Sequence, residues 1–138
     1  MVSFRHVGIV VHNLEEQLTF YRDFLGLEEY YNKTEEGQFL EDILNIKSIS
    51  AKIIKLGKNK KILIELLKFN YDGEKYTSSI INFGYTHIAL TVKNLTKIYK
   101  SNSSTFISKP KINNEGTHMV CFCKDPENNI LELVEELK

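Results

Sequence analysis

Two histidines and two glutamates stand at matching places in apolar stretches of the sequence, and together they could hold a metal ion. His6 and His87 each begin an apolar run, HVGIVV and HIALTV, while Glu65 lies within ILIELL and Glu132 within ILELVE. A carboxylate is costly to bury unless it is paired or bound to a metal. Two imidazoles and two carboxylates suit a borderline divalent ion such as Zn, Ni, Co or Mn.

Each of the four residues also has an ordinary interpretation when taken alone. A histidine at the start of a strand can simply form a hydrogen bond in place, and a glutamate between two leucines can face water. The metal hypothesis gains strength when the four are taken together. Each half of the chain would supply one histidine from its first strand and one glutamate from its last. If a pseudo-twofold relates the halves, the four side chains converge near its axis, and six-coordinate geometry leaves two positions for water or substrate.

An internal repeat supports this division into halves. A shift of 81 positions, from His6 to His87, aligns HVGIVVHNL with HIALTVKNL. His, Val, Asn and Leu recur in place, and each apolar position stays apolar or small. Such self-similarity is typical of a duplicated structural unit.

The elements that must position these residues follow the same order in each half. Asn13 predicts a helix N-cap, Glu16 completes a capping box, and apolar residues at helical spacing continue to Gly26. Asn94 predicts the start of a shorter second helix. Strands are expected near 7–11, 27–33, 50–56, 61–69, 88–92, 105–109, 118–123 and 130–135, and a short helical turn near 38–46.

This order predicts an α+β fold made of two βαβββ modules. Module one spans about 1–70, a linker about 71–83 and module two about 84–138, all within a single domain of 138 residues. Because side chains alternate along a strand, His6, Gly8 and Val10 share one face of the first strand. The larger apolar side chains on the other face can then pack under the helices.

Composition excludes several classes of protein. The chain carries 18 basic and 18 acidic residues, so no basic face for nucleic acid is expected. No apolar stretch approaches the roughly 18 residues of a membrane helix, and the opening residues MVSFRHVG do not resemble a signal peptide.

Cys121 and Cys123 are too close in sequence for an ordinary structural disulfide. We expect a cytoplasmic protein with reduced thiols packed in a strand.

With these motifs, the sequence resembles members of the vicinal oxygen chelate superfamily. That superfamily includes glyoxalase I, methylmalonyl-CoA epimerase, extradiol dioxygenases and the fosfomycin and bleomycin resistance proteins. The resemblance spans nearly the whole chain and rests on HVGIVVHNLEEQLTFYRDFLGL, ILIELL, YTHIALTV and KDPENNILELVE.

The resemblance implies a U-shaped eight-stranded sheet around one divalent metal ion, with His6, Glu65, His87 and Glu132 as ligands. In the dioxygenases only two histidines and one glutamate are ligands. Glyoxalase I and the epimerase also fill the place held here by Glu65, so the pattern is closest to glyoxalase I. Bleomycin-binding members usually lack the whole set.

Two departures concern the substrate. Bacterial glyoxalase I holds glutathione partly through an arginine and an asparagine at the places of Val10 and Phe69, so glutathione is not implied. The epimerases typically carry a second histidine where this chain has Thr86, and a His-Pro-Lys turn where it has Asp125-Pro126.

The implied activity is that of a metal-dependent isomerase or lyase. A small substrate with two adjacent oxygens would chelate the ion, which stabilises the enediolate formed when a carbon acid loses its proton. Glu132 is the expected base and Glu65 assists it. The alternatives are an acyl-CoA epimerase, an extradiol-type dioxygenase that uses His6, His87 and Glu132, or a resistance protein that sequesters a small molecule. The resemblance also implies a homodimer, with the site formed within one chain or across two swapped chains.

Overall fold

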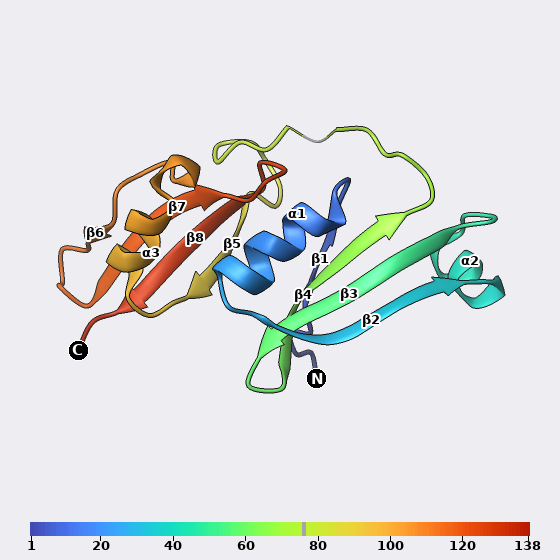
Figure 1. Ribbon diagram of the computed structural model, residues 1–138, viewed down its shortest axis with the longest axis horizontal. Coiled ribbons are helices and arrows are strands. Elements are labelled where there is room, and N and C mark those ends of the chain that lie inside the picture. Colours follow the sequence, from blue (N-terminus) through green and yellow to red (C-terminus); the bar gives the residue numbers. More distant parts are fainter. Residues whose placement is uncertain (76) are drawn as a thin grey trace. The chain divides into compact units, whose positions relative to one another are not determined.

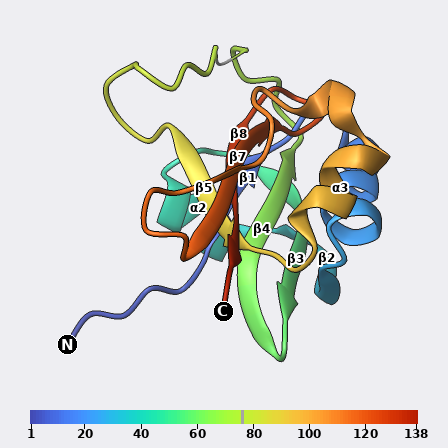
Figure 2. The same cartoon turned by 90° about the vertical axis from the view of Figure 1, so that its left-hand side faces the viewer.

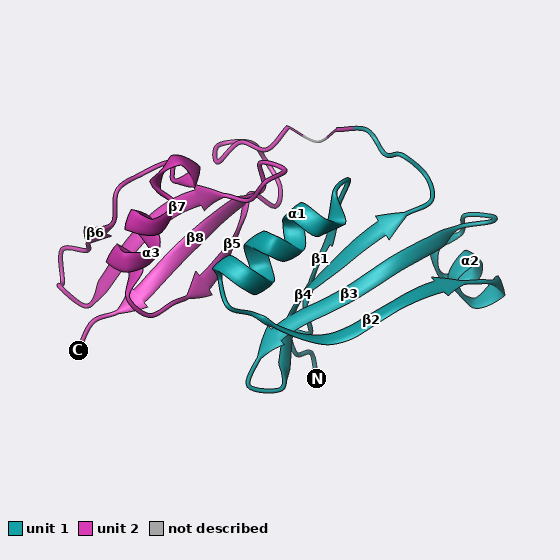
Figure 3. Ribbon diagram, viewed as in Figure 1, with its two compact units in different colours: residues 1–74 teal, residues 75–138 magenta. Residues whose placement is uncertain are grey.

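The structure is a computed structural model that describes residues 1–75 and 77–138. The chain divides into two compact units, Met1–Glu74 and Lys75–Lys138 (Figure 3). Over the described residues, each unit contains one four-stranded sheet.

The first unit builds its sheet in the order β1-β4-β3-β2 (Figure 1). Its strands are β1 (Val7–Val10), β2 (Glu28–Glu36), β3 (Ser50–Lys58) and β4 (Lys61–Phe69). β1 runs parallel to β4, and the other neighbours are antiparallel. The second unit repeats this order as β5-β8-β7-β6, again with a parallel first pair. Its strands are β5 (His87–Thr91), β6 (Lys111–Ile112), β7 (His118–Lys124) and β8 (Ile130–Glu136). The predicted fold of two βαβββ modules is therefore confirmed.

The first helix begins where the sequence predicted. Asn13 precedes α1 (Leu14–Leu18), and its Oδ1 accepts a hydrogen bond of 3.2 Å from the Glu16 amide. The helix continues as a π-helical segment, η1 (Thr19–Phe24), and Gly26 follows with a φ of 75°. The π-helical turn was not predicted, because the apolar spacing of this stretch fits either helical form.

The apolar residues of the first sheet separate onto two faces, as the alternation required. Ile9, Ile64 and Leu66 are buried on the face where α1 packs against β4. On the other face, α2 (Gln38–Leu44) helps to cover one end of the sheet. The cluster on that face contains Leu40, Ile49, Ala51 and Ile53, with Tyr31, Leu67 and Phe69 packed against it. Figure 2 shows α1, in blue, and α2 on opposite sides of this sheet.

The N-terminus of the second helix is capped by a residue that is distant in sequence. α3 (Leu95–Ser101) packs on β8, and Asn94 has a φ of 58° without a side-chain cap. Instead, the Glu135 carboxylate accepts hydrogen bonds of 3.0 and 2.8 Å from the amides of Asn94 and Leu95. The position of the helix start was predicted correctly, but the capping group is on β8.

One predicted strand is wrong. Residues 105–109 do not form a regular strand: η2 (Ser103–Thr105) is a 3-10 turn, and β6 begins only at Lys111. Phe106 makes a single bridge to Cys123, and Ser108 Oγ accepts a hydrogen bond of 3.1 Å from the Phe122 amide. A serine side chain thus replaces part of a strand ladder along this edge, an arrangement that residue type alone does not reveal.

Candidate functional site

The open face of the first sheet carries a histidine–glutamate pair. His6 directly precedes β1, and Glu65 lies opposite Gly8 in the parallel pairing of β1 with β4. This register places Glu65 on the face shared by His6 and Gly8. His6 Nε2 lies 3.6 Å from Glu65 Oε2, and the two side chains are 23% and 15% exposed.

The second unit carries an equivalent pair at an equivalent register. His87 begins β5, and Glu132 lies opposite Ala89, two residues after the histidine, just as Glu65 lies opposite Gly8. His87 Nε2 lies 3.2 Å from Glu132 Oε2, and the side chains are 31% and 26% exposed. The structure thus brings each predicted histidine together with the glutamate of its own unit.

Thr86 orients the His87 ring, a role that the sequence did not suggest. Thr86 Oγ1 and His87 Nδ1 share a hydrogen bond of 2.9 Å. With Nδ1 engaged, Nε2 is the nitrogen that faces Glu132. Metal-binding histidines usually have their second nitrogen held by such a partner, which fixes the ring and its tautomer.

The donor atoms of each pair fit a divalent ion. Two ligand atoms that each lie about 2.1 Å from one ion are about 3.0–3.5 Å apart, close to the 3.2 and 3.6 Å found here. Neither unit is complete by itself: across the described residues, no three histidine, cysteine or acidic side chains gather closely enough to hold a metal. Each unit supplies half of the predicted ligand set. That the two pairs together bind one metal ion stays a prediction.

The neighbours of the two glutamates differ sharply. Lys55 lies opposite Glu65 in the β3–β4 register, and its Nζ is 3.3 Å from Glu65 Oε2. The corresponding residue opposite Glu132 is Phe122. The Phe122 ring meets the His87 ring edge-on, with centroids 5.4 Å apart. The sequence analysis named neither Lys55 nor Phe122 as part of the site, because their positions depend on the strand register.

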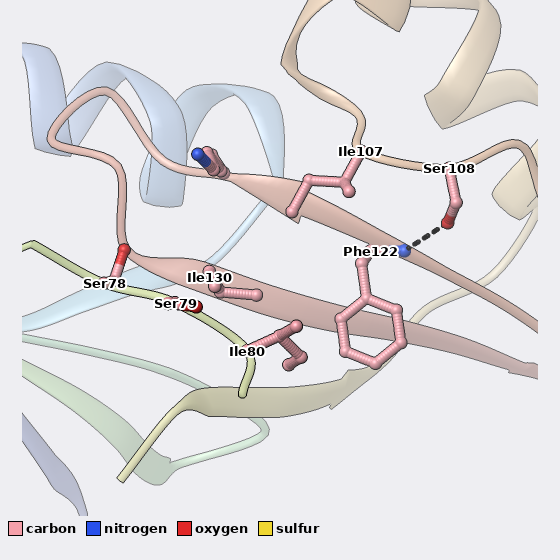
Figure 4. A pocket seen from close by; sticks show the side chains of 8 residues that line it. Ser78, Ser79, Ile80, Ile107, Ser108, Phe122 and Ile130 are labelled. Carbon is pink, nitrogen blue, oxygen red and sulfur yellow. Dashed lines mark hydrogen bonds between the residues drawn. The ribbon is translucent and has the colours of Figure 1, made fainter. Parts of the chain in front are cut away.

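A cavity of about 380 Å³ opens in the second unit beside Phe122. Phe122, Lys124 and Ile130 line it from the sheet, and Figure 4 shows Ser78, Ser79 and Ile80 of the connecting segment alongside them. Ile130 pairs with His87, and Phe122 with Glu132, so these residues share the face of the His87–Glu132 pair. Ile107 and Ser108 complete the lining.

The two cysteines take no part in the site. Cys121 and Cys123 are free and buried within β7. Burial raises the pKa of Cys121 to about 11 and that of Cys123 to about 12. Both are therefore neutral thiols at ordinary pH, and their burial confirms the prediction that they pack within a strand.

The paired βαβββ sheets, each with a histidine at the head of its first strand and a glutamate on its last, define a class of proteins built from two such modules. A model of the Glyoxalase/Bleomycin resistance protein/Dioxygenase superfamily matches residues 3–133. The chain belongs to this superfamily, as its motifs predicted. A comparison with curated proteins gives no match.

Solved structures share the fold at low sequence identity. A glyoxalase-family protein from Bacillus cereus is 19% identical with a TM-score of 0.88, over 100% of this chain and 96% of the other. A genomically encoded fosfomycin resistance protein, FosX, from Listeria monocytogenes is 15% identical with a TM-score of 0.65, over 99% and 95%. A superfamily member from Sphaerobacter thermophilus is 22% identical with a TM-score of 0.63, over 99% and 98%.

Among the described residues, no helix is both long and apolar enough to cross a membrane.

Proposed function

We propose that this protein is a metal-dependent isomerase or lyase of glyoxalase type that acts on a small molecule with two adjacent oxygens. The observation that carries the proposal is the repeated histidine–glutamate pair at the same register in both modules. Superfamily membership supports it, since many members are enzymes and commonly bind a divalent metal. A chain that only enclosed a ligand would not need two such pairs.

The four residues His6, Glu65, His87 and Glu132 would hold one ion of Zn, Ni, Co or Mn, either within one chain or across the two chains of a homodimer. When bound, the ion would supply positive charge next to the substrate oxygens and so favour loss of a proton from the adjacent carbon. The histidines act as ligands only, and Thr86 holds the His87 ring in the orientation that presents Nε2.

Glu132 is the better placed of the two carboxylates to accept that proton. Glu65 already has the Lys55 ammonium as an ion-pair partner, with Nζ 3.3 Å from its Oε2. Among the described residues, no lysine or arginine forms an ion pair with Glu132, whose facing neighbour is Phe122. We therefore assign proton transfer to Glu132 and an assisting role to Glu65.

The cavity beside Phe122 indicates that the substrate has an apolar part. Ile80, Ile107, Phe122 and Ile130 are the apolar lining residues of the cavity. Its volume of about 380 Å³ lies in the range of small-molecule sites. A substrate bound at the His87–Glu132 pair would place an apolar group there. Val10 and Phe69 occupy the places where bacterial glyoxalase I holds glutathione, so glutathione is not implied as part of the substrate.

Lys55 gives one observation in favour of a second candidate, a ring-cleaving dioxygenase. If Lys55 keeps Glu65 as its partner, three ligands remain: His6, His87 and Glu132. That set resembles the facial triad of two histidines and one carboxylate in non-haem iron oxygenases.

Turnover assays on the metal-loaded protein separate these candidates. The protein is loaded in turn with Zn, Ni, Co, Mn and anaerobic Fe(II), and screened against hemithioacetals, α-hydroxy thioesters and acyl-CoA epimers. Isomerisation or epimerisation without oxygen uptake supports the proposal. If the protein takes up oxygen with catechols, and does so only when loaded with Fe(II), the second candidate replaces the proposal. The free, buried thiols of Cys121 and Cys123 also support the proposal that the protein functions in the reducing cytoplasm.

A further inference from the structure

Lys55 forms an ion pair with Glu65 of the first histidine–glutamate pair. It lies in the middle of β3 and faces Tyr31 on β2 and Glu65 on β4. Its side chain is 24% exposed, so the ammonium still reaches the open face of the sheet. The cross-strand row runs from Tyr31 through Lys55 and Glu65 to Gly8, next to His6.

Tyr31 fixes the position of this ammonium. Lys55 Nζ lies 4.9 Å from the centroid of the Tyr31 ring, and Lys33 Nζ lies 5.4 Å from the same ring. The Tyr31 hydroxyl donates a hydrogen bond to Glu35, so the ring is held at both its face and its end. A cation over an aromatic ring is stabilised, more strongly where water is partly excluded.

The module fold does not require a cation at this place. In the second module the residue at the matching register is Phe122, which faces Glu132 as Lys55 faces Glu65. Both modules have the same strand order and the same parallel first pair. The shared strand order therefore does not dictate an ammonium at this place.

The charges of the proposed site allow Lys55 a role in binding. The carboxylates of Glu65 and Glu132 carry two negative charges, which balance one divalent ion when both histidines are neutral ligands. Once Glu65 binds the ion, the negative charge of its carboxylate balances the metal. The positive charge of the Lys55 ammonium is then no longer balanced by Glu65. A partly desolvated ammonium is stabilised by a negatively charged partner, and a bound ligand can provide one.

We propose that Lys55 binds a carboxylate of the substrate, distinct from the two oxygens that chelate the metal. The substrate is then an acid with two features: a chelating oxygen pair and an additional carboxylate. Lys55 is on this account a specificity-determining residue. The inference rests on the proposed function, because it takes Glu65 to be a metal ligand.

A matched pair of ligands tests the role of Lys55 without any turnover. Malate chelates through its hydroxyl and adjacent carboxylate and carries a second carboxylate. Its 4-amide, malamate, has the same chelating group and nearly the same shape, but that second group is neutral. Each is titrated calorimetrically into zinc-loaded protein, and the zinc content is measured before and after. The variants are Lys55→Met, Lys55→Arg and, as a control, Lys52→Met, which changes a lysine on the opposite face of β3.

Wild type and Lys52→Met are expected to bind malate about tenfold more tightly than malamate, the effect of one charge-assisted hydrogen bond. Lys55→Met should bind the two equally, and Lys55→Arg should keep most of the preference. A wild-type ratio near one, or a full preference kept by Lys55→Met, overturns the inference while leaving the metal site intact. A wild type that binds no zinc contradicts the proposed function and, with it, the role given to Lys55.

Discussion

Glu65 and Glu132 occupy the same place in their two modules. Each lies on the last strand, opposite the residue that follows its histidine by two positions on the parallel first strand. This register fixes which face each glutamate takes, because a slip of one residue would turn the carboxylate to the helix-covered side. If each pair supplies half of one metal site, as proposed, the equivalence accounts for the histidine at the start of both apolar strands.

Changing Glu132 to Gln should reduce turnover far more than metal content. Glutamine keeps an oxygen that can still ligate, but it cannot accept a proton at neutral pH. Loss of a general base typically slows turnover by roughly 10²–10⁴-fold. Steady-state kinetics, with metal content measured on the same samples, checks this outcome.

Glu65→Gln is the matched control for that experiment. Its effect on turnover should be much smaller, because Glu65 serves as ligand and assistant beside Lys55. If Glu132→Gln holds its metal and turns over at the wild-type rate, Glu132 is a ligand and not the base.

The Glu135 carboxylate should stabilise the start of α3 measurably. It accepts hydrogen bonds from the amides of Asn94 and Leu95, which would otherwise lack a cap. Loss of a helix cap typically costs about 0.5–2 kcal/mol. We expect Glu135→Ala to lower the free energy of unfolding by about 1–2 kcal/mol, and the neighbouring exposed Glu136→Ala to change it little. Equal effects in urea denaturation would show that Glu135 does not act as the cap.

Gly57 should be intolerant of any side chain. A Cβ built at this position would lie 1.9 Å from the Lys61 carbonyl oxygen, at the irregular end of the β3–β4 pairing. Overpacking of this kind typically costs about 1–3 kcal/mol. Because β3 and β4 carry Lys55 and Glu65, Gly57→Ala should weaken both stability and metal binding. Thermal unfolding and zinc titration of this variant check both effects.

The control for that substitution is Gly73→Ala. A Cβ at Gly73 meets no described atom within 4 Å, so the melting temperature should stay near that of wild type. A Gly57→Ala variant as stable as Gly73→Ala would mean that the hairpin adjusts freely.

The two cysteines should resist thiol reagents in the folded protein. Burial raises their pKa values to about 11 and about 12, so at pH 7.5 both thiols are protonated and therefore weak nucleophiles. Labelling with a chromogenic disulfide should be slow in buffer and rapid for both thiols in guanidinium. Fast labelling of the folded protein at pH 7.5 would contradict the buried position of Cys121 and Cys123.

The sequence predicted those parts of the fold that depend on local pattern and on the repeat. The cap at Asn13 and the two ends of β4 follow from residue type and period. The histidine–glutamate pairs follow from the repeat, because duplication makes their equivalence visible. The strand expected at 105–109 failed because this segment meets β7 only locally among the described residues. The Phe122 carbonyl accepts hydrogen bonds from the Ile107 and Ser108 amides, the Phe122 amide donates to Ser108 Oγ, and Phe106 forms a single bridge to Cys123.

Contacts between residues distant in sequence could not be predicted in this way. The cap from Glu135 depends on the approach of β8 to α3. The Lys55–Glu65 contact depends on the exact strand register. The same holds for Phe122, whose contact with His87 arises across the sheet.

The central claim, one divalent site built from two equivalent pairs, is tested most directly by a thermal melt of metal-stripped protein with added Zn, Ni, Co or Mn. A ligand at a hundredfold excess over its Kd stabilises the folded state by about 2.7 kcal/mol, so the melting temperature should rise by several degrees for at least one ion. His87→Ala should abolish that rise, whereas His118→Ala, which changes a histidine at the start of β7, should keep it. A wild-type melting temperature that none of the four ions raises would contradict the account.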